Sequence, residues 1–404
     1  MDNMEFERGN PQEDGPKRVA QRDWRKAGKI GLAVLGVIGV VMLILAIADT
    51  AVWDNIRRFG AHLLTEKDEN GCVQLYEYSA EKDRSSAMLG DNLVLASARH
   101  VMLINDRGEN LYSADVKFHR GAIATAGNWA AVYDVGGREI HLLGKEGLVR
   151  VLKAEGNILA CSVNEKGYLA VTSSKSGYKA AVSVYDQRGE LAFQFLSSDR
   201  FLMTAAVAPE CTQMAAVSMG MNTIPEEDEG TASDFESSVV LYDLKEKDPR
   251  ASQGFPGEAV VDLGLVGDNY CAVTEEALRF VDQNGTLAGS FEFEGRYLRR
   301  CSLGGGDYAA LVLGRSRSGA RARLVTVDEN GERIGQIRID DEVLSISASG
   351  KYVAVLYSDY LTIYDKKLRA LASLDDVSAA KSVLMRPDGS AVLVGAEAAS
   401  LYLP

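Results

Sequence analysis

Acidic side chains gather in the segment from Met219 to Ser237, which reads MGMNTIPEEDEGTASDFES and contains no base. Its six acids are Glu226, Glu227, Asp228, Glu229, Asp234 and Glu236. Their order does not follow the D-x-[DN]-x-[DN]-G spacing of a calcium loop. Acidic segments with few aromatic residues are often mobile and solvated. An insertion on one face of a repeat protein often marks the binding face. Two interpretations therefore stand, a solvated loop and a loop that binds a partner or a cation.

Histidine and cysteine, the usual metal ligands and nucleophiles, are scattered. His62, His100, His119 and His141 show no metal-ligand spacing to one another, to Cys or to a carboxylate. We place His100 and His141 at equivalent positions before the third strand of neighbouring repeats, and two ligands are too few for zinc. We assign Cys161, Cys211 and Cys301 to first strands, Cys271 to a second strand and Cys72 to a closing strand, as small apolar residues. No nucleophile or phosphate-loop motif occurs, so the sequence predicts no catalytic residue, no metal and no cofactor.

An aspartate recurs after short runs of alternating apolar residues, and a glycine often follows it. With Gly144 as a degenerate copy, the marks fall at Asp106, Gly144, Asp186, Asp243, Asp282, Asp328 and Asp365. An aspartate that begins a tight turn accepts a hydrogen bond from the backbone two residues further on. We therefore interpret these carboxylates as turn residues and not as a catalytic ring.

The chain around each mark predicts four short strands in a unit of about 40 residues, which is typical of a β-propeller. The last unit supplies three strands and then ends, whereas Cys72–Ser79 is an isolated strand before the first unit. This strand completes the last unit if it lies on its outer edge. We predict an all-β, eight-bladed β-propeller closed by this strand. Seven blades remain the alternative, because the second copy is degenerate.

The stretch from Gly177 to Glu190, followed by Ala206 to Glu210, resembles a family of single-pass, membrane-anchored bacterial β-propellers of unknown function. The resemblance implies a location and an architecture, but no reaction. The turn Pro387-Asp388-Gly389 is similar, at the level of the fold, to turns of WD-repeat and TolB-like propellers.

An apolar segment near the amino terminus predicts a membrane span. Ile30 to Ala48 has no charged residue, and a helix of this length nearly spans a hydrocarbon core of about 30 Å. Six bases and one acid between Lys17 and Lys29 place that side in the cytoplasm. We expect a disordered cytoplasmic tail (1–29), a transmembrane signal-anchor helix (30–50), a juxtamembrane linker (51–71) and an extracytoplasmic propeller (72–404). The alternative is a signal peptide cleaved after Ala48, which also exports the remainder.

The chain has a net charge of −13, and all of the excess acid follows Ala48, where 37 bases face 51 acids. This balance excludes nucleic acid as a partner and argues against anionic lipid as a target of the ring. We expect a non-enzymatic binding or scaffold protein of the cytoplasmic membrane that engages a protein, peptide or envelope component. The alternative is a hydrolase or lyase in the central channel. A sensor that couples an outside ligand to the tail is a third hypothesis.

Overall fold

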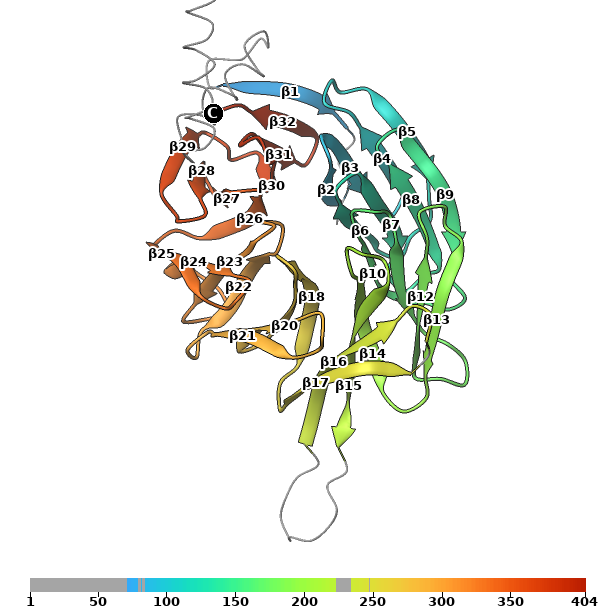
Figure 1. The fold of residues 1–404 in the computed structure, drawn as a ribbon. Coiled ribbons are helices and arrows are strands. Elements are labelled where there is room, and N and C mark those ends of the chain that lie inside the picture. Colours follow the sequence, from blue (N-terminus) through green and yellow to red (C-terminus); the bar gives the residue numbers. More distant parts are fainter. Residues whose placement is uncertain (1–70, 79–80, 82–83, 223–233, 247) are drawn as a thin grey trace, which may run out of the picture. The chain divides into compact units, whose positions relative to one another are not determined.

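The structure, a computed structural model, describes residues 71–78, 81, 84–222, 234–246 and 248–404. These residues form 32 strands. The strands make eight antiparallel sheets of four strands each, which we number as blades 1 to 8 (Figure 1). The prediction of eight blades is confirmed, and the seven-bladed alternative is wrong.

The first four blades follow the chain order. Blade 1 consists of β2 (Ser85–Leu89), β3 (Asn92–Ala96), β4 (His100–Ile104) and β5 (Asn110–Asp115). Blade 2 consists of β6 (Gly121–Ala126), β7 (Trp129–Asp134), β8 (Glu139–Gly144) and β9 (Gly147–Lys153). Blade 3 consists of β10 (Ile158–Val163), β11 (Leu169–Ser173), β12 (Ala180–Tyr185) and β13 (Leu191–Ser197). Blade 4 consists of β14 (Phe201–Val207), β15 (Gln213–Asn222), β16 (Asp234–Asp243) and β17 (Pro249–Pro256).

The last four blades continue in the same way until the chain ends. Blade 5 consists of β18 (Val260–Val266), β19 (Asn269–Thr274), β20 (Ala277–Val281) and β21 (Leu287–Glu292). Blade 6 consists of β22 (Tyr297–Ser302), β23 (Tyr308–Gly314), β24 (Ala322–Asp328) and β25 (Arg333–Ile339). Blade 7 consists of β26 (Val343–Ser349), β27 (Tyr352–Tyr357), β28 (Tyr360–Asp365) and β29 (Ala370–Asp375). Blade 8 consists of β30 (Ala380–Met385), β31 (Ala391–Gly395), β32 (Ala398–Tyr402) and β1 (Cys72–Glu77).

The amino-terminal strand closes the ring as predicted. β1 pairs antiparallel with β32, with Cys72 opposite Tyr402 and Glu77 opposite Ala398. The Tyr78 hydroxyl donates to the carbonyl oxygens of Gly395 (3.1 Å) and Ala398 (2.8 Å). The fourth strand of blade 8 therefore comes from the opposite end of the chain, which leaves β32 no free edge.

The core is divided into eight apolar clusters, one between each pair of neighbouring blades, including blades 8 and 1. A second strand such as β23 (YAALVLG) is buried at every position, since neighbouring blades cover both faces of its sheet. An outer strand such as β5 alternates between exposed and half-buried positions. Continuous apolar runs therefore mark inner strands, and alternation marks outer ones.

The connections between strands lie on two opposite faces of the ring because successive strands alternate in direction. The loops from second to third strands, and from each fourth strand to the next blade, lie on one face, which we call the arm face. The remaining turns lie on the opposite face, where β1 begins, which we call the entry face.

The recurring mark begins a turn on the entry face. The carboxylates of Asp186, Asp282, Asp328 and Asp365 each accept bonds from the N–H groups two and four residues further on. In blade 1 the prediction that Asp106 begins the turn is wrong. Asn105 occupies this position, and its Oδ1 accepts from Arg107 (3.0 Å) and Glu109 (2.8 Å). An amide oxygen therefore performs the same role as a carboxylate.

The predicted tail (1–29), membrane helix (30–50) and nearly all of the linker lie outside the described residues. Within the part of the chain that the structure describes, no helix has the length and apolar character needed to cross a membrane.

Candidate binding arm

The hairpin of β15 and β16 is longer than the sheet to which it belongs. The pairing of β14 with β15 ends at Phe201 opposite Met219, and that of β17 with β16 ends at Glu236 opposite Pro256. β15 and β16 remain paired as far as Asn222 opposite Asp234. We call Gly220–Asn222 and Asp234–Phe235 the arm, which extends outward from blade 4 (Figure 1).

An arginine immediately before β14 binds the base of the arm. The Nε of Arg200 donates to the Ser218 hydroxyl at 2.9 Å, and its Nη2 donates to the backbone oxygen of Glu236 at 3.0 Å. The same Nη2 lies 3.4 Å from the Glu236 carboxylate. Hydrogen bonds to charged groups contribute more than neutral ones, so Arg200 fixes the direction in which the hairpin leaves the sheet.

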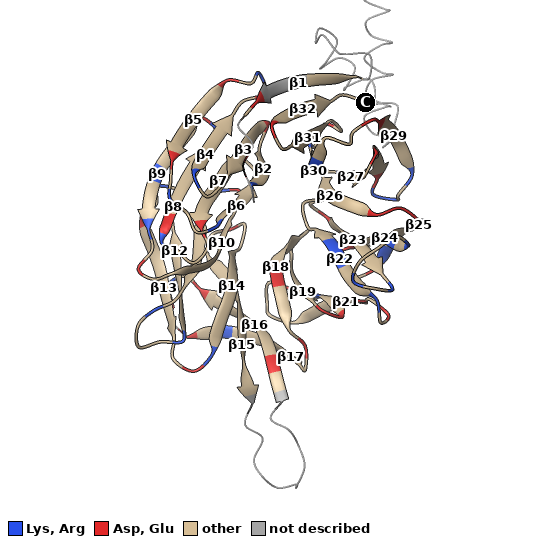
Figure 2. Cartoon of the chain, turned by 180° about the vertical axis from the view of Figure 1, so that it is seen from behind, with Lys and Arg blue, Asp and Glu red and all other residues tan. Residues whose placement is uncertain are grey.

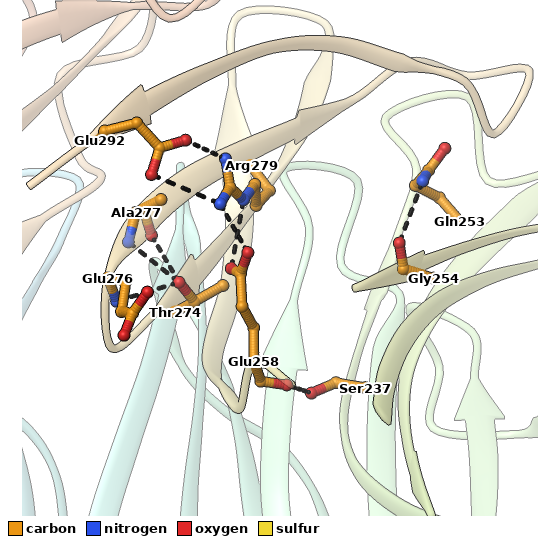
Figure 3. Close-up of polar contacts among 9 residues, drawn as sticks. All are labelled: Ser237, Gln253, Gly254, Glu258, Thr274, Glu276, Ala277, Arg279 and Glu292. Carbon is orange, nitrogen blue, oxygen red and sulfur yellow. Dashed lines mark hydrogen bonds and ion pairs between the residues drawn. The ribbon is translucent and has the colours of Figure 1, made fainter. Parts of the chain in front are cut away.

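Blade 5 supports the other side of the base (Figure 3). The Ser237 hydroxyl donates to the backbone oxygen of Glu258 at 2.5 Å and accepts from the N–H of Val260 at 3.0 Å. The Glu258 carboxylate in turn binds Arg279, whose Nη2 lies 2.5 Å from it, and Arg279 also binds Glu292. The start of blade 5 is thereby joined to β16 through side chains that are mostly buried.

A glycine on β17 makes room for the acid at the base. A Cβ on Gly254 would lie 2.4 Å from Oε1 of Glu236, closer than real contacts allow. The side chain of Gln253 bonds the neighbouring carbonyl oxygen of Gly254 at 3.1 Å (Figure 3). The Glu236 carboxylate therefore occupies the space that the missing side chain of Gly254 leaves free.

The six acids predicted for this insertion have different positions. Glu226, Glu227, Asp228 and Glu229 lie outside the described residues. Asp234 begins β16, paired with Asn222. Glu236 binds Arg200 at the base. The sequence indicated an insertion but not that the strands continue into it by several residues on each side.

Each described histidine lies beside one or two carboxylates. His100 lies between Glu81 and Asp115, at 2.5 and 3.2 Å. The His119 Nδ1 lies 2.9 Å from Asp134, which also accepts the backbone N–H of His119. Each of these pairs belongs to blade 1 or 2.

The third described histidine corrects a prediction. His141 lies inside β8 and is buried, between Glu139 and the Tyr112 hydroxyl, each at 2.8 Å, whereas His100 begins β4. The two positions are therefore not equivalent. Among the described residues, no group of three His, Cys, Asp or Glu side chains is arranged to hold a metal ion.

The cysteines match the predicted strands with one exception. Cys211 lies in the turn between β14 and β15, with φ of 59°, and not in a first strand. Burial raises the pKa of the thiols of Cys161 and Cys271, and raises that of Cys301 to about 12. A nucleophilic cysteine needs a lowered pKa, so these three thiols are packing residues.

Two cavities lie on blades 1 and 2. One, of about 540 Å³, opens on the arm face and is lined by Lys117, His119, Asp134, Arg138 and Lys153 among others. The other, of about 460 Å³, is on the entry face beside Trp129. Neither is lined by a residue of a first strand, so neither belongs to the centre of the ring.

Sequence reasoning missed a group of arginines on blade 6. The chain from Arg296 to Arg323 holds seven arginines and a single acid, Asp307. This local density was visible in the sequence, but the net negative charge of the chain after Ala48 concealed it.

Comparison with known proteins gives the family and the fold. The model of a family of unknown function matches residues 67–375. The chain belongs to the DUF5711 family. The match ends with β29, so it spans the first seven blades and β1 of this DUF5711 protein. A search of curated proteins finds no match.

Solved structures with the same architecture share little sequence with the DUF5711 chain. The C-terminal WD40 domain of Sif2 has a TM-score of 0.58 and 13% identity, over 82% of this chain and 98% of that one. BamB from Moraxella catarrhalis has a TM-score of 0.50 and 12% identity, over 82% and 99%. At such identities the likeness shows the propeller fold alone.

Proposed function

We propose that this DUF5711 protein is a membrane-tethered, non-enzymatic binding platform. Its extracytoplasmic propeller engages a protein, peptide or envelope component through the arm face. The observation on which this rests is the arm, a hairpin that continues past both neighbouring strands while Arg200 and Ser237 hold its base. A propeller does not need this extension to close, so the extension serves a contact outside the ring.

The proposed tether is the apolar segment from Ile30 to Ala48, with the amino terminus in the cytoplasm. The chain enters the propeller on the entry face, where β1 begins at Cys72. The arm and the arginines of blade 6 lie on the opposite face of the propeller.

The enzyme alternative has less support. The His119–Asp134 pair is the one described histidine pair that lines a cavity, and this cavity lies on blade 2, away from the first strands. Asp134 also accepts two backbone N–H groups, of His119 and Arg120, so it organises the loop between β5 and β6.

The test is chemical crosslinking of the full-length protein in cells, followed by mass spectrometry. In one variant an Asn-Gly turn replaces residues 221–235, which removes most of the arm while Arg200 and Glu236 remain in place. A control keeps the length and replaces Glu226, Glu227, Asp228 and Glu229 by their amides. We expect a specific partner to be lost with the shortened hairpin. A partner captured equally by both variants and the natural chain would contradict a role for the arm.

The orientation has its own test. A reporter that is active only outside the cytoplasm, fused after Pro404, gives signal if the propeller is exported. An inactive reporter on a stably expressed chain would refute the proposed topology.

A further inference from the structure

Blade 6 is basic on its arm side although the whole chain has a net charge of −13. Figure 2 shows basic residues on β22 and around β24. The one acid between Arg296 and Arg323 is Asp307, which lies in a turn on the entry face and pairs with Lys366 at 2.8 Å. The arginines of the arm side therefore have no acid of their own segment beside them.

Arg299 shapes the loop between β23 and β24. It is the bulged residue of β22, and its guanidinium donates to the carbonyl oxygens of Ser316 (2.9 Å), Ser318 (3.1 Å) and Gly319. A Cβ on Gly314 would lie 2.1 Å from Nε of Arg299, so a larger residue there would displace the guanidinium from this position. Arg299 therefore fixes the backbone of the loop that carries Arg315 and Arg317.

Arg300 is engaged with blade 7, where its Nε donates to the carbonyl oxygen of Leu344 at 3.1 Å. We call the other five arginines of this segment the arginine patch. It consists of Arg296, Arg315, Arg317, Arg321 and Arg323. The first four have no ion pair among the described residues, and Arg323 reaches one acid, Glu294, at 3.7 Å. Desolvation and the nearby charges of Arg323 and Arg315 lower the pKa of Arg296. Like charges at such proximity favour a bound anion.

The patch also contains an exposed aromatic ring. The Arg317 guanidinium lies 5.6 Å from the ring centre of Tyr297, which is 45% exposed. Arginine and tyrosine are enriched in the centres of protein interfaces.

Acidic side chains border the patch on both sides. On blade 5, in the connection from it to blade 6 and in the loop before blade 7, the exposed acids include Glu275, Glu276, Glu292, Glu294, Asp340, Asp341 and Glu342. A broad anionic surface, such as a lipid leaflet or a nucleic acid duplex, would also cover these carboxylates and be repelled. A narrow acidic segment can contact the arginines and meet a single carboxylate, that of Glu294, which Arg323 reaches.

We propose that the arginine patch binds a short acidic segment of a partner polypeptide. Guanidinium groups bind carboxylates through paired hydrogen bonds, so aspartate and glutamate side chains are the matching groups. This inference rests on the proposed function, because it names the class of partner that the platform holds.

The test uses the full-length protein in phosphatidylcholine nanodiscs and a fluorescein-labelled hexaglutamate peptide, with binding followed by anisotropy. We expect binding that weakens with salt and falls about tenfold or more in the triple variant R315E/R317E/R321E. The matched control is K117E/R138E/K153E, which makes the same change of charge on the arm face of blade 2. We expect the control to bind nearly as well as the natural chain. If thermal unfolding shows that the triple variant is misfolded, the alanine triple replaces it.

Several results would overturn the proposal. These are no binding of hexaglutamate, equal loss in patch and control variants, or tighter binding of phosphatidylglycerol vesicles or a DNA duplex. Self-association that the patch variant abolishes would identify a second copy of the chain as the occupant instead. If the crosslinked partner depends on the arm but is unaffected by R315E/R317E/R321E, the platform stands and the patch proposal alone fails.

Discussion

Single side chains set the turns of this ring. Asn105 and Asp282 occupy the same position in blades 1 and 5, and each accepts two backbone N–H groups. The requirement is an acceptor oxygen at the first turn position and not a negative charge. The N–H of Thr286 and other donors lower the pKa of Asp282.

The first prediction concerns Asp282. Asp282→Ala removes both acceptors and should destabilise the protein by about 1 kcal/mol, whereas Asp282→Asn should retain most of the stability. Since the folded pKa lies below the unfolded one, the natural chain loses this contribution as the pH falls through the folded pKa, and the Asn variant does not. Thermal unfolding at neutral and acid pH measures both effects. Equal losses for Ala and Asn at neutral pH would contradict the acceptor argument.

Asp262 behaves in the opposite way. It lies on the first strand of blade 5, and solvent reaches part of the residue. Its negative charge is near enough to Cys271 and Cys301 to raise the pKa of both thiols. Desolvation among these strands raises the pKa of Asp262 above 3.8, against one hydrogen bond from the N–H of Leu263. Ionisation of this group therefore opposes folding.

The second prediction follows from the raised pKa of Asp262. Below the unfolded pKa, Asp262 is neutral in both states and costs nothing, and the cost grows as the pH rises through the folded pKa. Asp262→Asn should raise the thermal midpoint at pH 7 and leave it nearly unchanged near pH 3. Parallel midpoint curves for the two proteins across this range would refute the raised pKa.

At the scale of elements, irregular pairing positions the side chains that leave the core. Six first strands carry a bulge near their start, at Leu159, Met203, Val261, Arg299, Leu344 and Lys381. A bulge inserts an unpaired residue and bends the strand. In blade 6 this places Arg299 against the next loop, and in blade 4 Arg200 precedes the bulged strand and holds the arm.

The third prediction tests the base of the arm. Arg200→Ala removes bonds to Ser218 and Glu236 and should cost about 2 kcal/mol, since a half-buried carboxylate loses its cation. Arg200→Lys keeps the charge but lacks the planar fork that reaches both partners, so its loss should be intermediate. Limited proteolysis should cut the hairpin of β15 and β16 faster in Ala than in Lys. Unchanged cleavage in both variants would show that Arg200 does not fix the arm.

At the scale of the whole molecule, the ring depends on a contact between the two ends of the chain. Blade 8 is complete with β1 in place, and the cluster between blades 8 and 1 includes Tyr78, Leu93, Val392 and Leu401. In the other blades the fourth strand follows the third directly in sequence, whereas in blade 8 the two come from opposite ends of the chain. Such a long-range pairing is slow to form, and it covers the outer edge of β32.

The fourth prediction tests closure. Replacing Cys72–Tyr78 by a Gly/Ser segment of equal length should lower the thermal midpoint by many degrees and promote aggregation, because β32 becomes an edge strand. Tyr78→Phe removes the hydroxyl bonds and keeps the ring and the strand, so it should cost about 1–2 kcal/mol. Light scattering during a thermal ramp separates the two variants. A Gly/Ser variant as stable as Tyr78→Phe would show that β1 does not close the ring.

The sequence alone determined the class of the fold and predicted the exchange of strands between the two ends. It favoured eight blades over seven, and the structure decided between them. The class and the exchange were predictable because period-two runs and turn residues such as Asp186 are local, and the strand count at each end requires closure. It did not predict the bulges, since Leu159 and Arg299 share a backbone position but no side-chain chemistry.

Only the tertiary structure decided where charge matters. Arg296 and Arg323 are 27 positions apart in the sequence, and packing within blade 6 brings their charges together. Strand pairing in blade 4 likewise joins Glu236 to Arg200 across 36 positions. One of the acids considered for partner binding therefore supports the arm instead. Local patterns specify strands, whereas a surface is composed of side chains from several strands, and only their pairing and register decide which of them meet.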